Sequence, residues 1–168
     1  DVTAGRSLVG VAPGLHLVPV EHEGNAVLSR PEIIELERLA RSVIGTPWTA
    51  SADGIPAPLR ADQVLVVAPY NAQVNAIREH LDAVGLGAVR VGTVDKFQGQ
   101  EAPVVLVSMT ASSPEEVPRG IGFLMNRNRV NVAISRAQWA TYLLSSPRLT
   151  DYMPTTPYGF AELGAFLG

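Results

Sequence analysis

The stretch "VVLVSM", residues 104–109, decides the fold class of this chain. It is apolar apart from one serine, and three of its residues are β-branched valines. An apolar run without polar alternation is typical of a parallel strand that is covered by helices on both faces. The stretch therefore predicts a central strand of a parallel sheet, with strands and helices alternating on either side of it.

The flanking sequence fits this prediction. Ser29 and Glu32 form a capping-box pattern, and Pro31 suits the first turn of the helix that follows. Apolar residues recur at helical spacing in three segments, and apolar strands lie between them. The predicted helices cover residues 29–45, a segment from Asn71 to about Val84, and about 126–137, and the predicted strands cover 14–20, 64–68, 88–94, 104–109 and 141–146. Residues 46–62, rich in proline and glycine, are expected to form a loop.

This alternation predicts an α/β sandwich of three layers with a mostly parallel sheet. The chain has 168 residues, 46% hydrophobic and 17% charged, which indicates one globular domain. We expect residues 1–168 to form a single domain with its core at about 15–147 and a tail at 148–168. The chain begins at Asp1 rather than at methionine, so we expect it to be a fragment of a longer protein.

Charge and composition exclude several classes of protein. The net charge of −3 excludes a basic module that coats nucleic acid, so any contact with phosphate must be local. Cysteine is absent, which excludes disulfides and thiolate metal sites and fits a cytoplasmic location. No apolar run is long enough to cross a membrane, so no membrane association is expected. The histidines show no ligand spacing, and no metal site is predicted.

The segment between residues 93 and 101, "TVDKFQGQE", joins two predicted strands and carries possible nucleotide contacts. Glu101, just before the central strand, could accept hydrogen bonds from a ribose hydroxyl. Thr93 and the exposed amides of the loop could donate to phosphates. The alternative is a solvated loop that turns at Gly99.

Arg129 and Arg136 are seven residues apart in the predicted helix at 126–137, so they share a face that differs from the apolar one. A guanidinium group is always charged and matches the geometry of phosphate. Over a transferring phosphoryl group it accelerates the reaction by about 10³- to 10⁵-fold. The alternative is a surface salt bridge that contributes about 0–1 kcal/mol.

The segment "PYNAQ", residues 69–73, follows a predicted strand and begins a helix. Tyr70, Asn71, Gln73 and the helix-terminal N–H groups could meet a phosphate backbone. The alternative is that Asn71 only caps the helix. Ligands of parallel sheets usually lie beyond the carboxyl ends of the strands, and all three polar stretches fall at that edge or lead from it.

Two features of nucleotide-binding proteins are absent from this sequence. Lys96 is the only lysine, and Phe97 follows it, so there is no P-loop. No Asp-Glu pair follows an apolar strand, so the usual acidic partner of Mg²⁺ is missing as well. If the chain serves a nucleotide reaction, the main half of the site must lie elsewhere.

Three stretches together resemble a known family. "VLVVAPYNAQ", "VGTVDKFQGQEAPVVLVSM" and "GFLMNRNRVNVAISRAQ" occur in the order and at the spacing of the second RecA-like domain of superfamily 1 helicases. They are most similar to the 5′-to-3′ branch, which includes the nonsense-mediated-decay helicase and its nuclease-helicase relatives. The resemblance covers roughly residues 15–147. It implies a RecA-like fold of the P-loop NTPase type without a P-loop of its own.

The resemblance also implies roles for individual residues. Arg136 matches the arginine finger, and Arg129 matches a basic position in the same motif that supports the finger or contacts phosphate. Gln98, Gly99 and Glu101 match the loop that meets ATP, with Glu101 at the ribose. Thr93, and further Tyr70, Asn71 and Gln73, match positions that contact the nucleic-acid backbone.

The same resemblance implies the partners. ATP and Mg²⁺ would be bound mainly by a first RecA-like domain of the same parent chain, and the polymer would be single-stranded DNA or RNA. The family's Tyr-Arg motif would lie just upstream of this sequence. The parent protein would be an ATP-driven helicase, and this fragment alone would be inactive. Two alternatives stay open: a nucleic-acid-binding α/β module without ATP coupling, and an unrelated α/β domain that uses the same loops structurally.

Overall fold

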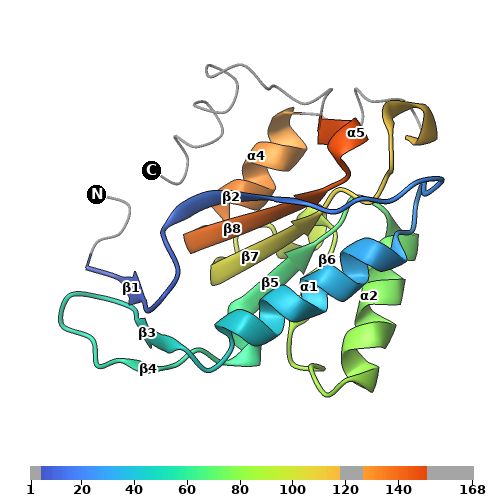
Figure 1. Ribbon diagram of the computed structural model, residues 1–168. Helices are drawn as coiled ribbons and strands as arrows, with labels where there is room; N and C mark the ends of the chain where they lie inside the picture. The colour runs from blue at the N-terminus through green and yellow to red at the C-terminus, as the bar shows by residue number, and fades with distance from the viewer. Residues whose placement is uncertain (1–4, 118–126, 151–168) are drawn as a thin grey trace.

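The computed structural model describes the backbone of residues 5–117 and 127–150, and the side chains of 5–117 and 131–149. Its centre is a sheet of five parallel strands in the order β2-β8-β7-β5-β6 (Figure 1). The strands are β2 (Gly14–Pro19), β5 (Val64–Val67), β6 (Arg90–Gly92), β7 (Ala102–Ser108) and β8 (Ala137–Ser145). β7 lies in the middle and all of its residues are buried, which confirms the prediction made from "VVLVSM".

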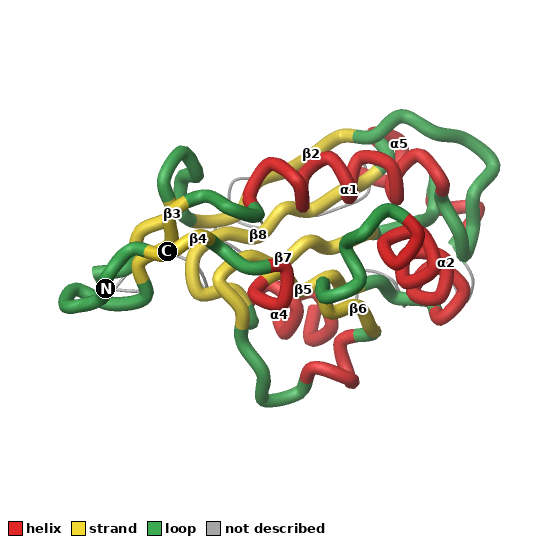
Figure 2. The backbone as a smooth tube through the Cα atoms, turned by 90° about the horizontal axis from the view of Figure 1, so that it is seen from below, coloured by secondary structure: helices red, strands yellow, loops and turns green. Residues whose placement is uncertain are grey.

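Helices cover both faces of this sheet and give three layers (Figures 1 and 2). The helices are α1 (Arg30–Val43), α2 (Asn71–Ala83), α4 (Arg127–Ser135) and the short α5 (Pro147–Thr150), with 3-10 turns η1 (Ala61–Gln63), η2 (Val94–Phe97) and η3 (Pro114–Glu116). α1 and α2 pack on one face, and α4 and η2 pack on the other. The predicted α/β class with a RecA-like arrangement is confirmed.

Alternation along the strands divides the hydrophobic core into two layers. In β5, Val64 and Val66 belong to the cluster under α1 and α2, whereas Leu65 and Val67 belong to the cluster under α4 and η2. β7 divides in the same way. Successive side chains of a strand point to opposite faces, so a strand that is apolar throughout supports both layers.

A second, antiparallel sheet was not predicted. β1 (Ser7–Leu8), β3 (Pro47–Thr49) and β4 (Ala57–Pro58) pair in the order β1-β3-β4, so residues 46–62 are only partly loop. Trp48 of β3 is buried and meets the ring of Trp139 edge-on at a centroid distance of 6.4 Å. Strands of two or three residues carry no periodic pattern, and tertiary packing of Trp48 holds them in place.

The last helix and strand have different boundaries from those predicted. α4 ends at Ser135 and β8 begins at Ala137, so Arg136 lies in the single-residue turn between them rather than inside a helix. Ala137 is paired with Ala102 at the start of β7. This pairing draws the chain into the sheet four residues earlier than its apolar run suggested.

The first helix is capped differently from the predicted capping box. The Ser29 hydroxyl accepts from the Glu32 N–H at 3.4 Å, as expected, but the N–H of Ser29 donates to Gln73 Oε1 at 2.8 Å. The Glu32 carboxylate instead accepts from the Ser108 hydroxyl at 2.7 Å and from the Thr110 N–H at 3.0 Å. Glu32 is fully buried, and its carboxylate is bonded to residues at the end of β7. The Gln73 side chain therefore takes the place of Glu32 as the acceptor for the N–H of Ser29.

Candidate nucleotide edge and nucleic-acid edge

The expected site residues fall at two opposite edges of the parallel sheet. Tyr70 and Asn71 follow the carboxyl end of β5, and Thr93 follows the carboxyl end of β6. Glu101 directly precedes β7, and Arg136 directly precedes β8, so both lie at the amino ends of the strands. The segment 93–101 therefore leads from the carboxyl edge at Thr93 to the amino edge at Glu101.

The amino edge brings Arg136 next to the loop that contains Glu101. The N–H of Ala102 donates to the carbonyl oxygen of Arg136 at 2.9 Å, so the residue after Glu101 is bonded to Arg136 directly. The Arg136 side chain is half-buried, and its Nε is buried with no hydrogen-bond partner among the described residues. A buried donor without a partner costs about 1–3 kcal/mol, and more when the group is charged.

Glu101 is held from two sides. Its main-chain oxygen accepts from Arg90 Nη2 at 3.3 Å, and its Oε2 accepts from Gln138 Nε2 at 3.4 Å. The residue is otherwise exposed, so the carboxylate remains open to a hydroxyl donor. Gln138 and Arg90 were not singled out from the sequence, because a polar residue at the start of a strand carries no signal of its partner.

The turn before Glu101 depends on two glycines. Gly99 has φ +79°, in the left-handed region that favours glycine, and Gln98 beside it is exposed. At Gly92, a Cβ would lie 2.5 Å from Cδ of Lys96, so the side chain of Lys96 packs where a larger residue would sit. Lys96 Nζ donates to the carbonyl oxygen of Val91 at 3.0 Å, so the only lysine of the chain is anchored within η2 and β6.

Arg129 lies in the described backbone of α4, and its side chain is outside the described residues. The buried Oδ1 of Asn131, on the same helix, has no hydrogen-bond partner among the described side chains. Asn131 was not singled out from the sequence, because it reads as one polar residue in a packed helix.

At the carboxyl edge the structure separates exposed residues from buried ones. Asn71 is exposed at the first position of α2. The N-cap of this helix is Tyr70, whereas the sequence suggested Asn71 as a possible cap. Thr93 is half-buried and its side chain makes no capping hydrogen bond to η2. Burial raises the pKa of the Tyr70 phenol above its ordinary value, so Tyr70 is neutral at physiological pH.

Gln73 occupies a different environment from its neighbours. Its side chain is fully buried, and its Nε2 donates to the carbonyl oxygen of Ser29 at 3.2 Å and to the Ser108 hydroxyl at 3.1 Å. Both ends of the amide are thus used inside the protein. The side chain does not face solvent, so we assign it to the α1 cap rather than to a nucleic-acid contact.

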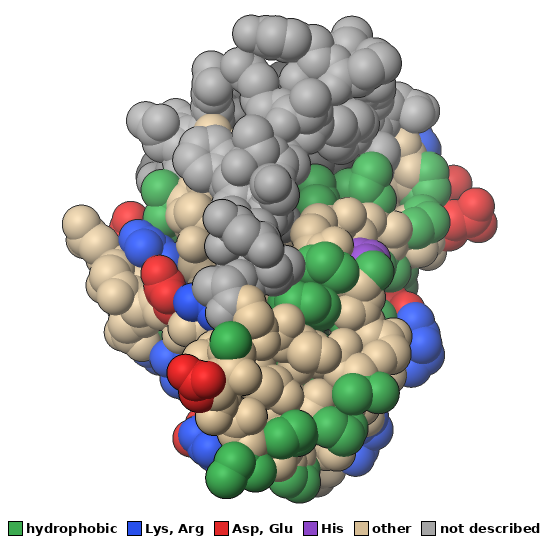
Figure 3. Space-filling view, turned by 90° about the vertical axis from the view of Figure 1, so that its left-hand side faces the viewer, with side chains coloured by type: hydrophobic (Ala, Val, Ile, Leu, Met, Phe, Trp, Pro, Cys, Tyr) green, Lys and Arg blue, Asp and Glu red, His purple; other side chains and the backbone are tan. Residues whose placement is uncertain are grey.

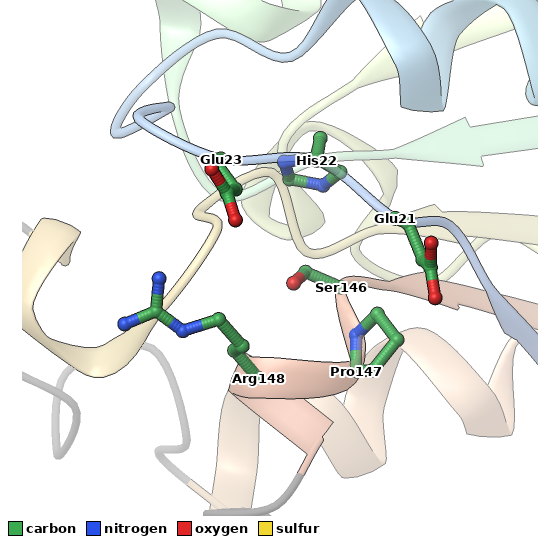
Figure 4. A pocket seen from close by; sticks show the side chains of 6 residues that line it. All are labelled: Glu21, His22, Glu23, Ser146, Pro147 and Arg148. Atoms are coloured by element: carbon green, nitrogen blue, oxygen red, sulfur yellow. The ribbon is translucent and has the colours of Figure 1, made fainter.

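A hollow of about 250 Å³, partly open to solvent, lies beyond the carboxyl ends of β2 and β8 (Figure 4). One wall is formed by Glu21, His22 and Glu23 after β2, and the other by Ser146, Pro147 and Arg148 after β8. The His22 side chain is turned inward, and its Nε2 pairs with Glu32 at 2.6 Å. This hollow contains none of the residues expected to bind ATP or nucleic acid.

The face that carries β1, β3 and β4 shows charged side chains of both signs side by side (Figure 3). The described part of this face has no broad basic patch, so an anion there would be bound by individual guanidinium groups. Within residues 5–117 and 127–150, no cluster of three histidine, aspartate or glutamate residues could hold a metal ion. No helix in that part is long and apolar enough to cross a bilayer.

Comparison with known proteins agrees with this arrangement. The model of the AAA domain family matches residues 36–148, which is more than half of the chain. The chain is 27% identical over 135 residues to the regulator of nonsense transcripts 1 homolog of Arabidopsis thaliana, covering 80% of this chain and 10% of that protein. It is 36% identical over 101 residues to the human RNA helicase Mov10l1, and the match covers 58% of this chain and 8% of that protein. It is 43% identical over 82 residues to the DNA polymerase alpha-associated DNA helicase A of Schizosaccharomyces pombe, and the match covers 49% of this chain and 12% of that protein.

The chain belongs to the AAA domain family. Within it, the chain is a superfamily 1 helicase domain of the nonsense-mediated-decay type. It spans about a tenth of the length of the curated relatives that it matches.

Proposed function

We propose that this chain is the second RecA-like domain of an ATP-dependent helicase, and that Arg136 acts as its arginine finger. One observation carries the proposal: the carbonyl oxygen of Arg136 accepts from the N–H of Ala102, the residue after Glu101, so the residue that bears the guanidinium group and the Glu101 loop share the amino edge of the sheet. A γ-phosphate oxygen is an acceptor that suits both the charge and the planar geometry of this group.

ATP would be bound mainly by a first RecA-like domain of the same parent chain, since this sequence has no P-loop. Mg²⁺ would be held there too, because the described residues offer no cluster of ligands for it. When bound, Mg²⁺ neutralises charge on the phosphates. Glu101 would accept from the ribose, Gln98 and Gly99 would lie against the nucleotide, and Arg129 would support Arg136. The chain alone would then hydrolyse no ATP.

The carboxyl edge would contact the polymer. Asn71 and Thr93 have side chains that can donate to phosphate oxygens, and Tyr70 offers an aromatic ring. Such contacts read the backbone and not the bases, so little sequence preference is expected. Relatives named as RNA helicases and one named as a DNA helicase support nucleic acid as the polymer class.

Coupling would follow from the position of the two edges on one rigid sheet. While the γ-phosphate is present, Arg136 favours a closed cleft between the two RecA-like domains. After hydrolysis that contact is lost and the cleft opens, as in other phosphate-gated hinge motions. The carboxyl edge moves with the sheet, so each cycle would shift the grip along one strand.

Substitution of Arg136 tests this proposal in the full-length protein. We expect Arg136→Ala to lower kcat for nucleic-acid-stimulated ATP hydrolysis by at least about 100-fold, because the guanidinium stabilises charge that develops in the transition state. The Kd of a non-hydrolysable ATP analogue should change much less. Arg38→Ala is a matched control, since Arg38 is an exposed arginine that pairs with Glu35 on the same helix, α1. A kcat for Arg136→Ala within a few-fold of the wild type would remove the assignment.

A second candidate function is a nucleic-acid-binding module without ATP coupling. The net charge of −3 and the mixed charges of the face in Figure 3 disfavour a module that depends on electrostatic attraction alone. The same assay separates the two functions: the module would bind nucleic acid, but nucleic acid would not stimulate any turnover that depends on Arg136.

A further inference from the structure

We propose that Arg90 is a positioning residue for the nucleotide, which fixes the backbone at Glu101 and so directs the Glu101 carboxylate. This inference rests on the proposed function, in which Glu101 meets the ribose. Arg90 is the first residue of β6 and is not one of the polar residues of the three sequence motifs, so the proposal adds a residue to the site.

All three nitrogen atoms of the Arg90 guanidinium group donate hydrogen bonds, and their acceptors lie in two segments of the chain. Nε donates to the carbonyl oxygen of Asp62 at 3.0 Å, Nη1 donates to Gln100 Oε1 at 3.0 Å, and Nη2 donates to the carbonyl oxygen of Glu101 at 3.3 Å. The group thereby ties η1 to the loop before β7. A planar fork with fixed donor directions restricts two neighbouring residues at once, whereas the donors of a compact ammonium group rotate freely.

The loop requires such a restraint. Residues 98–101 are all exposed, and Gly99 allows more backbone conformations than any other residue type would. Gln100 is held further by its Nε2, which donates to the carbonyl oxygen of Lys96 at 3.4 Å. An exposed loop that is ordered before the ligand arrives loses less conformational entropy when the ligand binds.

Arg90 holds these segments through neutral acceptors and not through an ion pair. Its three contacts are two carbonyl oxygens and one amide oxygen, and it forms no salt bridge within residues 5–117 and 127–150. The nearby Asp62 carboxylate is paired with Arg60 at 2.9 Å instead. Arg90 therefore acts on the Glu101 loop through the directions of its donors.

Gln138 restrains the same residue from the opposite side. Arg90 of β6 holds the main chain of Glu101, whereas Gln138 of β8 holds its carboxylate through Nε2 at 3.4 Å. Two strands that are not neighbours in the sheet thus fix one exposed acid. The Glu101 side chain is left with one oxygen, Oε1, that none of the described hydrogen-bond donors uses.

The test measures nucleotide affinity and sugar selectivity in the full-length protein. Arg90→Ala should raise both the KM for ATP and the Kd of a non-hydrolysable ATP analogue about tenfold, within the range that contacting residues show in mutant cycles. kcat should stay within about twofold, because a ribose contact acts equally in the ground state and the transition state. In Arg90→Ala the preference for ATP over 2′,3′-dideoxyadenosine triphosphate should disappear as the affinity for ATP falls.

Three further variants make the result specific. Arg60→Ala removes a neighbouring exposed arginine and should leave KM unchanged. Arg90→Lys keeps the charge and loses the fork, so it should behave like Arg90→Ala. In the double variant with Glu101→Ala, Arg90→Ala should add less than about twofold, because the two residues act through one contact.

The outcomes separate this inference from the proposed function. If Glu101→Ala weakens ATP binding while Arg90→Ala does not, or if the two effects multiply, the positioning role is overturned and the nucleotide edge stands. A wild-type Kd for Arg90→Lys also overturns it, since charge alone would then suffice. If Glu101→Ala changes neither affinity nor sugar selectivity, the ribose contact in the proposed function fails and the role of Arg90 fails with it.

Discussion

Asn71 and Gln73 are two residues apart on α2, yet only Asn71 can meet a ligand. Asn71 is exposed at the helix start, whereas the Gln73 amide is buried between the α1 cap and the end of β7. From the sequence they belong to one polar segment, and both were expected to contact nucleic acid. The helical spacing turns them about 200° apart, so one faces solvent and the other faces the core.

This difference predicts opposite effects for two substitutions. Gln73→Ala should destabilise the protein by about 1–3 kcal/mol, because the buried N–H of Ser29 would lose its acceptor. Asn71→Ala should leave stability unchanged and weaken binding to single-stranded nucleic acid. Hydrogen exchange of the α1 amides measures the first effect, and fluorescence anisotropy with a labelled oligonucleotide measures the second. Wild-type protection of α1 in Gln73→Ala would contradict the assignment.

At the scale of elements, the contact between α1 and α2 carries a charged group of its own. Glu37 of α1 accepts from Arg41 Nε at 2.8 Å and from His80 Nε2 of α2 at 2.7 Å. The hydrogen bond from Arg41, and after it that from His80, hold the pKa of the Glu37 carboxyl below its ordinary value of 4.5. The carboxylate form therefore favours the folded state.

The sign of the pH dependence follows from this lowered pKa. Glu37 contributes stability above pH 4.5, and that contribution is lost as the pH falls through the lower pKa of the folded state. In Glu37→Gln the decrease in thermal stability between about pH 5 and pH 3 should be shallower than in the wild type. Glu35→Gln is the control, because Glu35 pairs with Arg38 on α1 alone and does not join the two helices. The same decrease in thermal stability at low pH for the wild type and for Glu37→Gln would contradict this prediction.

The long elements could be predicted from the sequence, and the short ones could not. β5 is apolar throughout, β7 is apolar apart from Ser108, and α1 has strong helical periodicity, so the faces that these elements bury could be read from the sequence. β1, β3 and β4 depend on Trp48 packing against residues far along the chain. α4 ends earlier than predicted because Ala137 pairs with Ala102. The periodicity of the local sequence gives no information about this contact.

The sequence named the residues of the candidate site, but it did not show how they are arranged in space. Motif order placed Arg136 and Glu101 in one site, and the bond between Arg136 and Ala102 brings them together. The sequence did not show that this site lies at the amino edge, because the segment 93–101 crosses from one edge to the other without a full helix. It also did not show Arg90, whose partners become neighbours only through the order β7-β5-β6.

At the scale of the whole molecule, the two edges are connected by a sheet that is buried on both faces. The seven residues of β7 place its ends about 20 Å apart. Hydrophobic clusters above and below the sheet leave little room for independent movement of one edge. In the proposed function, a change of contact at Arg136 would therefore move the carboxyl edge as part of one rigid body.

The most direct measurement is a structure of the full-length protein with a non-hydrolysable ATP analogue and a single-stranded oligonucleotide. The proposal predicts a nitrogen of the Arg136 guanidinium within about 2.7–3.2 Å of a γ-phosphate oxygen. It also predicts Glu101 at the ribose, and the oligonucleotide at the opposite edge beside Thr93 and Asn71. A triphosphate bound at the carboxyl edge, or an Arg136 side chain that touches no phosphate in the closed complex, would contradict the account.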